Sequence, residues 1–157
     1  MTTPKQNYSF NVNGKEYSVE AFSMERLLDV LCHQCQLIGC KEGCGEGECG
    51  SCSVLLNGQL VNSCLIPITQ VQGAEILTVE GLAAEPIGQK LQNAFVQHGG
   101  AQCGICTPGM LLASYNLLRD NPKPSLEEIK VGLAGNLCRC TGYMKIFDSV
   151  QAAAGEA

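Results

Sequence analysis

The chain has 157 residues, enough for one ordinary domain or two small ones, and a formal net charge of -5. Its ten Lys and Arg residues form no run, which argues against nucleic-acid binding, and no stretch of about 18 apolar residues predicts a membrane span. Because the N-terminus lacks the layout of a signal peptide, we expect a soluble, cytoplasmic protein. In that compartment eleven cysteines favour metal binding, since disulfides are rare there and an odd number cannot pair completely.

The first 80 residues carry the signals of short strands around one helix. Two Asn-Gly pairs, Asn13-Gly14 and Asn57-Gly58, separate neighbouring strand-like runs and are typical of tight hairpin turns. The leucines within residues 24–31 recur at helical spacing and predict one helix. The runs that predict strands are residues 8–12, 16–19, 53–56, 59–61 and 76–79. We expect a small mixed sheet with one helix across it.

Beyond Gly81 the apolar residues recur in steps of three and four, which predicts helices instead of strands. The sequence therefore predicts an α+β chain with two domains, residues 1–80 and residues 81–157. The residues that define the first helix of the second domain are Ile87, Leu91, Ala94 and Phe95.

Three further helices are predicted from their start signals. Thr107-Pro108 is typical of an N-cap followed by proline at the first helical position. Ser125 and Glu128 have the spacing of a capping box, and a last helix is expected to start at Thr141 or Gly142. Four helices in about 75 residues predict a compact bundle.

The stretch from Cys32 to Cys52 holds six cysteines, and one spacing rule divides them. A plant-type 2Fe-2S centre uses C-x4-C-x2-C with a distant fourth cysteine, because three thiolates from one tight loop must wrap around two irons. Only Cys44, Cys49 and Cys52 fit this spacing, and Cys64 is the natural fourth ligand. These four residues form the first cysteine set. The glycines among them allow the backbone to turn sharply and to bring N–H donors close to the sulfurs.

The second cysteine set combines the pair Cys103 and Cys106 with the pair Cys138 and Cys140. A C-x-x-C turn can direct two sulfurs at one point, and C-x-C in an extended chain places both side chains on the same side. Four thiolates therefore converge from two loops. By ligand number alone they could hold a tetrahedral zinc ion or a second 2Fe-2S centre.

The motifs GCKEGCGEGECGSCSVLLNG, QCGICTPGM and GNLCRCTGY together resemble the iron-sulfur subunit of molybdenum hydroxylases. This group includes xanthine dehydrogenase, aldehyde oxidoreductase, carbon monoxide dehydrogenase and nicotinate dehydrogenase. The resemblance implies a β-grasp, plant-type ferredoxin domain followed by a four-helix-bundle domain, each with one 2Fe-2S cluster, and so it favours iron over zinc. It implies that the first cysteine set holds the cluster facing the flavin subunit and the second set a buried cluster beside the pterin. Gln102 and Cys140 match positions that approach the molybdopterin in the family.

The resemblance also implies a reaction, the hydroxylation of a heteroaromatic or aldehyde carbon with oxygen from water. The molybdenum centre would lie in a large partner subunit, and two electrons would leave it one at a time through both clusters to FAD in another subunit. This chain would supply no catalytic residue and no turnover of its own. Its contribution would be the spacing, potential and burial of the clusters.

Two other functions are compatible with the residues. One is a zinc-organised structural or interaction module in which both cysteine sets are structural. The other is a stand-alone ferredoxin that uses only the first cysteine set, with the helical half as a docking domain.

Two groups of residues near the first cysteine set are interpreted without a metal. Three cysteines outside both sets are interpreted as small apolar residues and not as an additional metal or redox site; these are Cys32, Cys35 and Cys40. Three acidic residues either lower the potential of the first cluster or keep the loop solvated, and we favour solvation; these are Glu42, Glu46 and Glu48.

Overall fold

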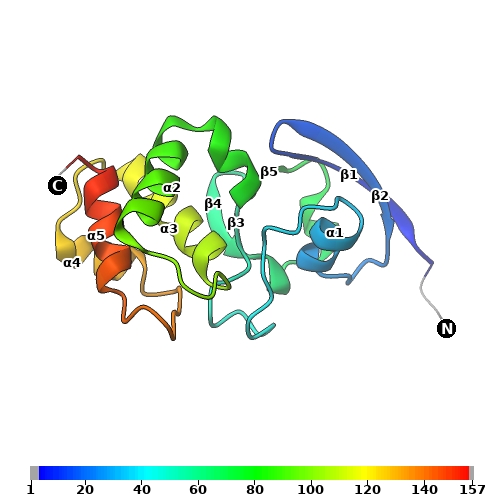
Figure 1. Cartoon of the computed structure of the whole chain (residues 1–157). Helices are drawn as coiled ribbons and strands as arrows, with labels where there is room; N and C mark the ends of the chain where they lie inside the picture. Colours follow the sequence, from blue (N-terminus) through cyan, green and yellow to red (C-terminus); the bar gives the residue numbers. More distant parts are fainter. Residues whose placement is uncertain (1–3, 156–157) are drawn as a thin grey trace.

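The computed structural model describes residues 4–155. The outer ends of the two predicted domains, residues 1–3 and 156–157, lie outside the described residues. A sheet with one helix is followed by four helices, and the two parts lie at opposite ends of the molecule (Figure 1). The strands and the helix of the first part are β1 (Gln6–Val12), β2 (Lys15–Ala21), α1 (Leu27–His33), β3 (Ser53–Leu56), β4 (Gln59–Asn62) and β5 (Glu75–Leu77). The later helices are α2 (Pro86–His98), α3 (Thr107–Asp120), α4 (Leu126–Gly132) and α5 (Met144–Ala153).

Short 3-10 turns connect these elements: η1 (Ser63–Leu65), η2 (Ile68–Val71) and η3 (Val79–Ala84). The five strands form one sheet in the order β2-β1-β5-β3-β4. The pair β1 and β5 is parallel and the other pairs are antiparallel, so the expected mixed sheet is confirmed.

Both predicted hairpins are confirmed. Asn13 and Gly14 have φ values of 54° and 79°, and Asn57 and Gly58 have 49° and 81°. Two successive left-handed residues give the turn a twist that matches the twist of the flanking strands. Each Asn-Gly pair therefore sets the register of its hairpin.

Two predicted boundaries in the first part were wrong. Helix α1 begins at Leu27 and not at residue 24, because Arg26 is extended (φ -70°, ψ 139°) and pairs with Pro67 in a single β-bridge. Strand β5 ends at Leu77, because Thr78 is the extended residue that precedes the turn η3. In both places the apolar pattern of the sequence extends beyond the residue at which the element begins or ends.

Two helix starts in the second part also differ from the prediction. The N-cap of α3 is Cys106, with Thr107 as the first helical residue and no side-chain capping bond. Helix α5 begins at Met144, because Tyr143 is left-handed with a φ of 69°. The capping box before α4 is confirmed: Ser125 Oγ accepts from the Glu128 N–H at 3.3 Å, and the Glu128 carboxylate accepts from the Ser125 N–H at 2.7 Å.

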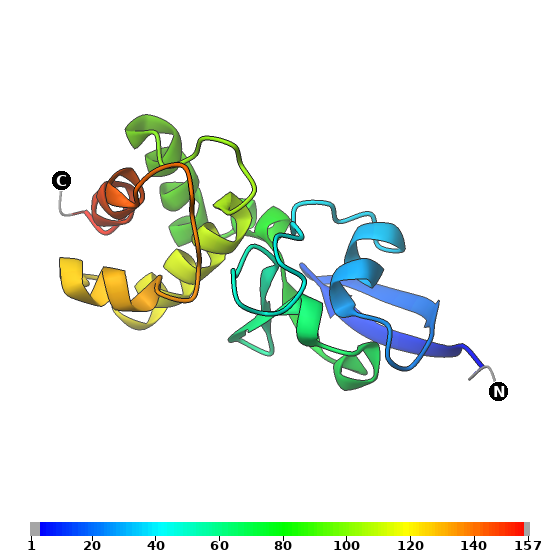
Figure 2. The same cartoon turned by 90° about the horizontal axis from the view of Figure 1, so that it is seen from below.

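The apolar side chains form two separate clusters. One lies between the sheet and α1, and the other lies among α2 to α5 with Leu55 of β3 as a member. Helix α3 packs against β3 and β4, so it joins the two parts (Figure 2). No helix within residues 4–155 combines the length and the apolar character that crossing a bilayer requires.

Candidate metal centres

The loop between α1 and β3 carries three residues of the first cysteine set. Gly47 and Gly50 turn it through positive φ values of 81° and 69°. A β-carbon on Gly47 would lie 2.2 Å from Leu65 Cδ1, and one on Gly50 would lie 2.5 Å from the Gly135 carbonyl oxygen. Glycine is therefore favoured at both positions by conformation, and at Gly50 also by space, because the close atom there is backbone.

The first cysteine set forms two pairs of thiols. The Glu46 N–H donates to Cys44 Sγ and the Cys44 N–H donates to Cys49 Sγ, both at 3.3 Å. Hydrogen bonds from backbone N–H groups lower the pKa of Cys44 to about 7, and the largest contribution comes from the N–H of Glu46. The Cys49 thiol also donates a hydrogen bond to the Cys44 sulfur. Burial and a hydrogen bond to Cys52 raise the pKa of Cys64 to about 11. The pair Cys44 and Cys49 lies toward the surface, whereas Cys52 and Cys64 are buried.

The second cysteine set also forms two pairs, and each pair takes one cysteine from each motif. Cys140 donates to Cys103, and both are exposed. Cys106 donates to Cys138, and both are buried. Burial and the Cys138 thiol raise the pKa of Cys106 to about 12.

Side chains from the loop before α5 hold Cys138 in place. Its backbone N–H donates to Tyr143 Oη at 3.0 Å, and Thr141 Oγ1 donates to its sulfur at 3.2 Å. Burial alone would raise the pKa of Cys138. Hydrogen bonds from Thr141, the Cys140 backbone and the Cys106 thiol have a larger effect than burial and lower this pKa to about 7. The loop before α5 is therefore built to favour a thiolate.

The arrangement of the sulfurs fits a two-iron group. Within residues 4–155, no three Cys, His, Asp or Glu side chains converge on the position of one metal ion. Each set instead has two separate pairs of thiols, and a 2Fe-2S group is held by four thiolates, two on each iron. The donor chemistry of both sets thus fits a 2Fe-2S group.

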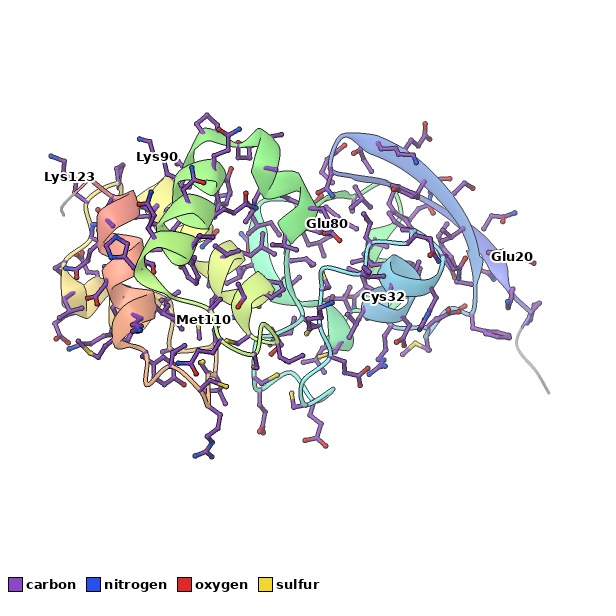
Figure 3. All side chains as sticks on the ribbon, viewed as in Figure 1. Glu20, Cys32, Glu80, Lys90, Met110 and Lys123 are labelled. Atoms are coloured by element: carbon purple, nitrogen blue, oxygen red, sulfur yellow. The ribbon has the colours of Figure 1, made fainter. Side chains whose placement is uncertain are left out.

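The two sets lie next to each other through a direct loop contact. The Leu137 N–H donates to the Cys49 carbonyl oxygen, and Asn136 Nδ2 donates to the Gly50 carbonyl oxygen, both at 2.9 Å. Helix α3 approaches the same point, since a β-carbon on Gly109 would lie 2.0 Å from the Gly50 oxygen. Sulfur atoms gather along the lower edge of the molecule beneath Met110 (Figure 3). One backbone hydrogen bond therefore connects Cys49 with the residue before Cys138.

Gln102 and Cys140, the predicted molybdopterin contacts, are both exposed next to Cys103. Three large apolar residues within four positions of Cys103 or Cys140 in the sequence are exposed as well: Ile105, Leu137 and Met144. Within this chain the second set is therefore half exposed, with Cys106 and Cys138 as its buried half.

The three remaining cysteines belong to the first apolar cluster, Cys35 and Cys40 as buried members and Cys32 packed against it. Burial raises the pKa of all three thiols, that of Cys35 to about 11. The Cys32 thiol donates to the Cys40 carbonyl oxygen at 3.8 Å. These neutral, packed thiols are consistent with their interpretation as small apolar residues.

Sequence reasoning missed the residues that hold the sulfur loops. Asn136, Thr141 and Tyr143 stand within the motif GNLCRCTGY, but nothing in their spacing shows that Asn136 bonds to Gly50 in another loop or that Thr141 and Tyr143 bond to Cys138 in their own. Arg26 carries no local signal at all, although its guanidinium contacts the loop of the first set.

Two known families match this chain. One is described as a 2Fe-2S iron-sulfur cluster binding domain and matches residues 3–92. The other is described as a 2Fe-2S binding domain and matches residues 78–151. The chain is therefore an iron-sulfur protein with two types of 2Fe-2S-binding domain.

Similar proteins specify the family. The chain is 46% identical over 145 residues to a probable xanthine dehydrogenase subunit of Bacillus subtilis (strain 168), covering 92% of this chain and 83% of the relative. It is 45% identical over 147 residues to the nicotinate dehydrogenase small FeS subunit of Eubacterium barkeri, covering 94% of each. The crystal structure of quinoline 2-oxidoreductase from Pseudomonas putida 86 superimposes with a TM-score of 0.91 at 40% identity, covering 96% of this chain and 94% of that chain. The chain belongs to the family of small iron-sulfur subunits of molybdenum hydroxylases, which are oxidoreductases.

Proposed function

We propose that this chain is the electron-transfer subunit of a cytoplasmic molybdenum hydroxylase. It passes single electrons from a molybdopterin centre in a large subunit through two 2Fe-2S clusters to FAD in another subunit. Each 2Fe-2S group, when bound, would take up and release one electron. The observation that carries the proposal is the hydrogen bond from the Leu137 N–H to the Cys49 carbonyl oxygen, because it joins the loops of the two cysteine sets.

We assign one cluster to each cysteine set. The ligands of the first cluster are Cys44, Cys49, Cys52 and Cys64, and those of the second are Cys103, Cys106, Cys138 and Cys140. The pairing of the thiols and the backbone donors to the sulfurs support this assignment. A β-grasp domain over residues 1–80 and a four-helix domain over residues 81–157 would each hold one cluster, and the two apolar clusters support that division.

We place the large subunit on the face with Cys103 and Cys140. Ile105, Leu137 and Met144 are 45%, 52% and 58% exposed there, and exposed apolar groups beside a functional site are typical of a protein interface. Gln102 and Cys140 would contact the molybdopterin on this face. The flavin subunit would face the exposed Cys44 side of the first set.

The test is purification of the native protein together with its partner chains. We expect a brown complex with about four irons and four acid-labile sulfides per copy of this chain, two distinct EPR signals, and molybdenum and FAD in the other chains. A colourless protein that contains zinc would contradict the proposal. A single EPR signal in an isolated chain would favour the stand-alone ferredoxin.

A further inference from the structure

Arg26 holds two carboxylates with one guanidinium. Its Nε and Nη2 donate to the two oxygens of Asp29 at 2.7 and 2.8 Å. Its Nη1 and Nη2 donate to the two oxygens of Glu42, both at 3.1 Å. Asp29 belongs to α1 and Glu42 to the loop of the first cysteine set, so the guanidinium ties this loop to the helix. Only the planar fork of arginine matches two carboxylates in this way.

The backbone at Arg26 is tied to a second segment of the same site. Arg26 pairs with Pro67, and the Leu27 N–H donates to the Ile66 carbonyl oxygen at 2.8 Å. Ile66 lies two residues after Cys64, the fourth cysteine of the first set. Arg26 therefore contacts the loop with Cys44 through its side chain and holds the segment with Cys64 through its backbone.

The guanidinium lies close to the turn that carries the Cys44 sulfur. A β-carbon on Gly45 would lie 3.4 Å from Arg26 Nη1. Gly45 stands between Cys44 and Glu46, and the Glu46 N–H donates to Cys44 Sγ at 3.3 Å. The positive charge thus lies against the backbone that solvates this sulfur.

The part of the sequence that contains Arg26 is strongly acidic. Between Lys15 and Lys90 the sequence has ten acidic residues and two basic ones, Arg26 and Lys41. The Lys41 ammonium donates to the Ile38 carbonyl oxygen at 2.7 Å, whereas the Arg26 guanidinium binds the acidic loop itself. A nearby cation lowers the cost of adding an electron to an anionic centre, and nearby carboxylates raise that cost.

We propose that Arg26 is a positioning residue of the first iron-sulfur site: it anchors the Cys44 loop through Glu42 and raises the reduction potential of the cluster bound there. This inference rests on the proposed function, because it requires a cluster on the first cysteine set. It also revises the interpretation of Glu42, which acts as the anchor point of the loop and not as a solvating residue alone.

The experiment is a redox titration of the purified complex, followed by EPR, for Arg26→Gln. At a fixed potential, the ratio of reduced to oxidised first cluster should fall roughly two- to tenfold, and the second cluster should not change. Arg119→Gln is the matched control, because Arg119 has a similar side-chain exposure (38% against 35%) and an ion pair with Asp120 at the far end of α3. The shift should shrink at high salt, since the ion pairs are partly exposed.

Two further variants separate charge from anchoring. Glu42→Gln should shift the ratio in the opposite direction, because it removes a negative charge. Arg26→Lys should keep the ratio near that of the wild type but lose the first cluster faster to a chelator, because it keeps the charge without the fork. Shifts of Arg26→Gln and Glu42→Gln in the same direction, or no shift in either, would overturn the inference while the proposed function stands. A wild-type protein without two EPR signals would overturn the proposed function instead.

Discussion

The two cysteine sets arrange their sulfurs by different means. In the first set three cysteines share one loop of nine residues, and backbone N–H groups of that loop donate to Cys44 and Cys49. In the second set two short motifs lie thirty-one residues apart, and side chains of Thr141 and Tyr143 hold Cys138. The first set is therefore organised by backbone donors of its own loop, and the second by side chains of the loop that precedes α5.

This difference has a consequence for tolerance to mutation. Backbone donors cannot be removed by exchanging a side chain, so the first set should tolerate side-chain changes at the positions between Cys44 and Cys52 that are neither glycine nor cysteine. The second set depends on specific hydroxyl groups and on the contact of α3 with Gly50, so distant substitutions should disturb it. Substitutions that affect one cysteine set and not the other test this difference.

The largest effect is expected from Cys138→Ser. If Cys138 is a ligand of the second cluster, this variant should lose one of the two EPR signals, and its iron content should fall from about four to about two per chain. Cys32→Ser is the control, since Cys32 lies outside both sets, and it should keep both signals. Two intact signals in Cys138→Ser would contradict the assignment of the second set.

Gly109→Ala should strain the contact between the two loops. The added methyl group would lie 2.0 Å from the Gly50 carbonyl oxygen, which is backbone and cannot move aside easily. We expect the free energy of unfolding to fall by about 1–3 kcal/mol in chemical denaturation. Gly135→Ala is the matched control, because nothing lies within 4 Å of a β-carbon there. Equal stability of the two variants would show that the contact is loose.

Thr141→Val should change the titration of one thiol in the cluster-free protein. The Thr141 hydroxyl is part of what holds the pKa of Cys138 near 7, so its loss should raise that pKa. Cys138 is a thiolate above its pKa, and its alkylation should therefore begin at higher pH in the variant, as measured by mass spectrometry. Alkylation of Cys44, whose pKa of about 7 comes first from the Glu46 N–H, should not change. An equal shift in the alkylation pH of Cys138 and Cys44 would contradict the view that different groups set the pKa values of the two thiols.

The smallest effect on stability is expected from Ile105→Ser on the exposed face of the second set. Ile105 is 45% exposed, so the free energy of unfolding should change by less than about 0.5 kcal/mol. Binding of the large subunit should weaken by about 1 kcal/mol, or roughly fivefold in Kd. Val96→Ser on α2, where the side chain is 83% exposed, should leave binding unchanged. Unchanged binding in both variants would place the interface elsewhere.

The parts of the fold that follow local rules could be predicted from the sequence. The two Asn-Gly hairpins, the four later helices and the capping box at Ser125 all depend on residues close together in the chain. Of the boundaries that were wrong, the one at Arg26 depends on a β-bridge to another segment, at Pro67, and the one at Tyr143 on a left-handed backbone. Tyr143 is left-handed while its hydroxyl accepts from the Cys138 N–H, a bond that no propensity predicts.

The sequence by itself predicted that Cys44, Cys49 and Cys52 act together, because C-x4-C-x2-C is a local spacing within one loop. It also determined the family through three motifs. Only the tertiary structure decided which thiols pair within each set, that the two loops share hydrogen bonds through Asn136 and Leu137, and that Arg26 lies against Gly45. These contacts join residues up to 88 positions apart, Cys49 and Leu137, and their geometry is set by packing between segments and not by the order of residues along one segment.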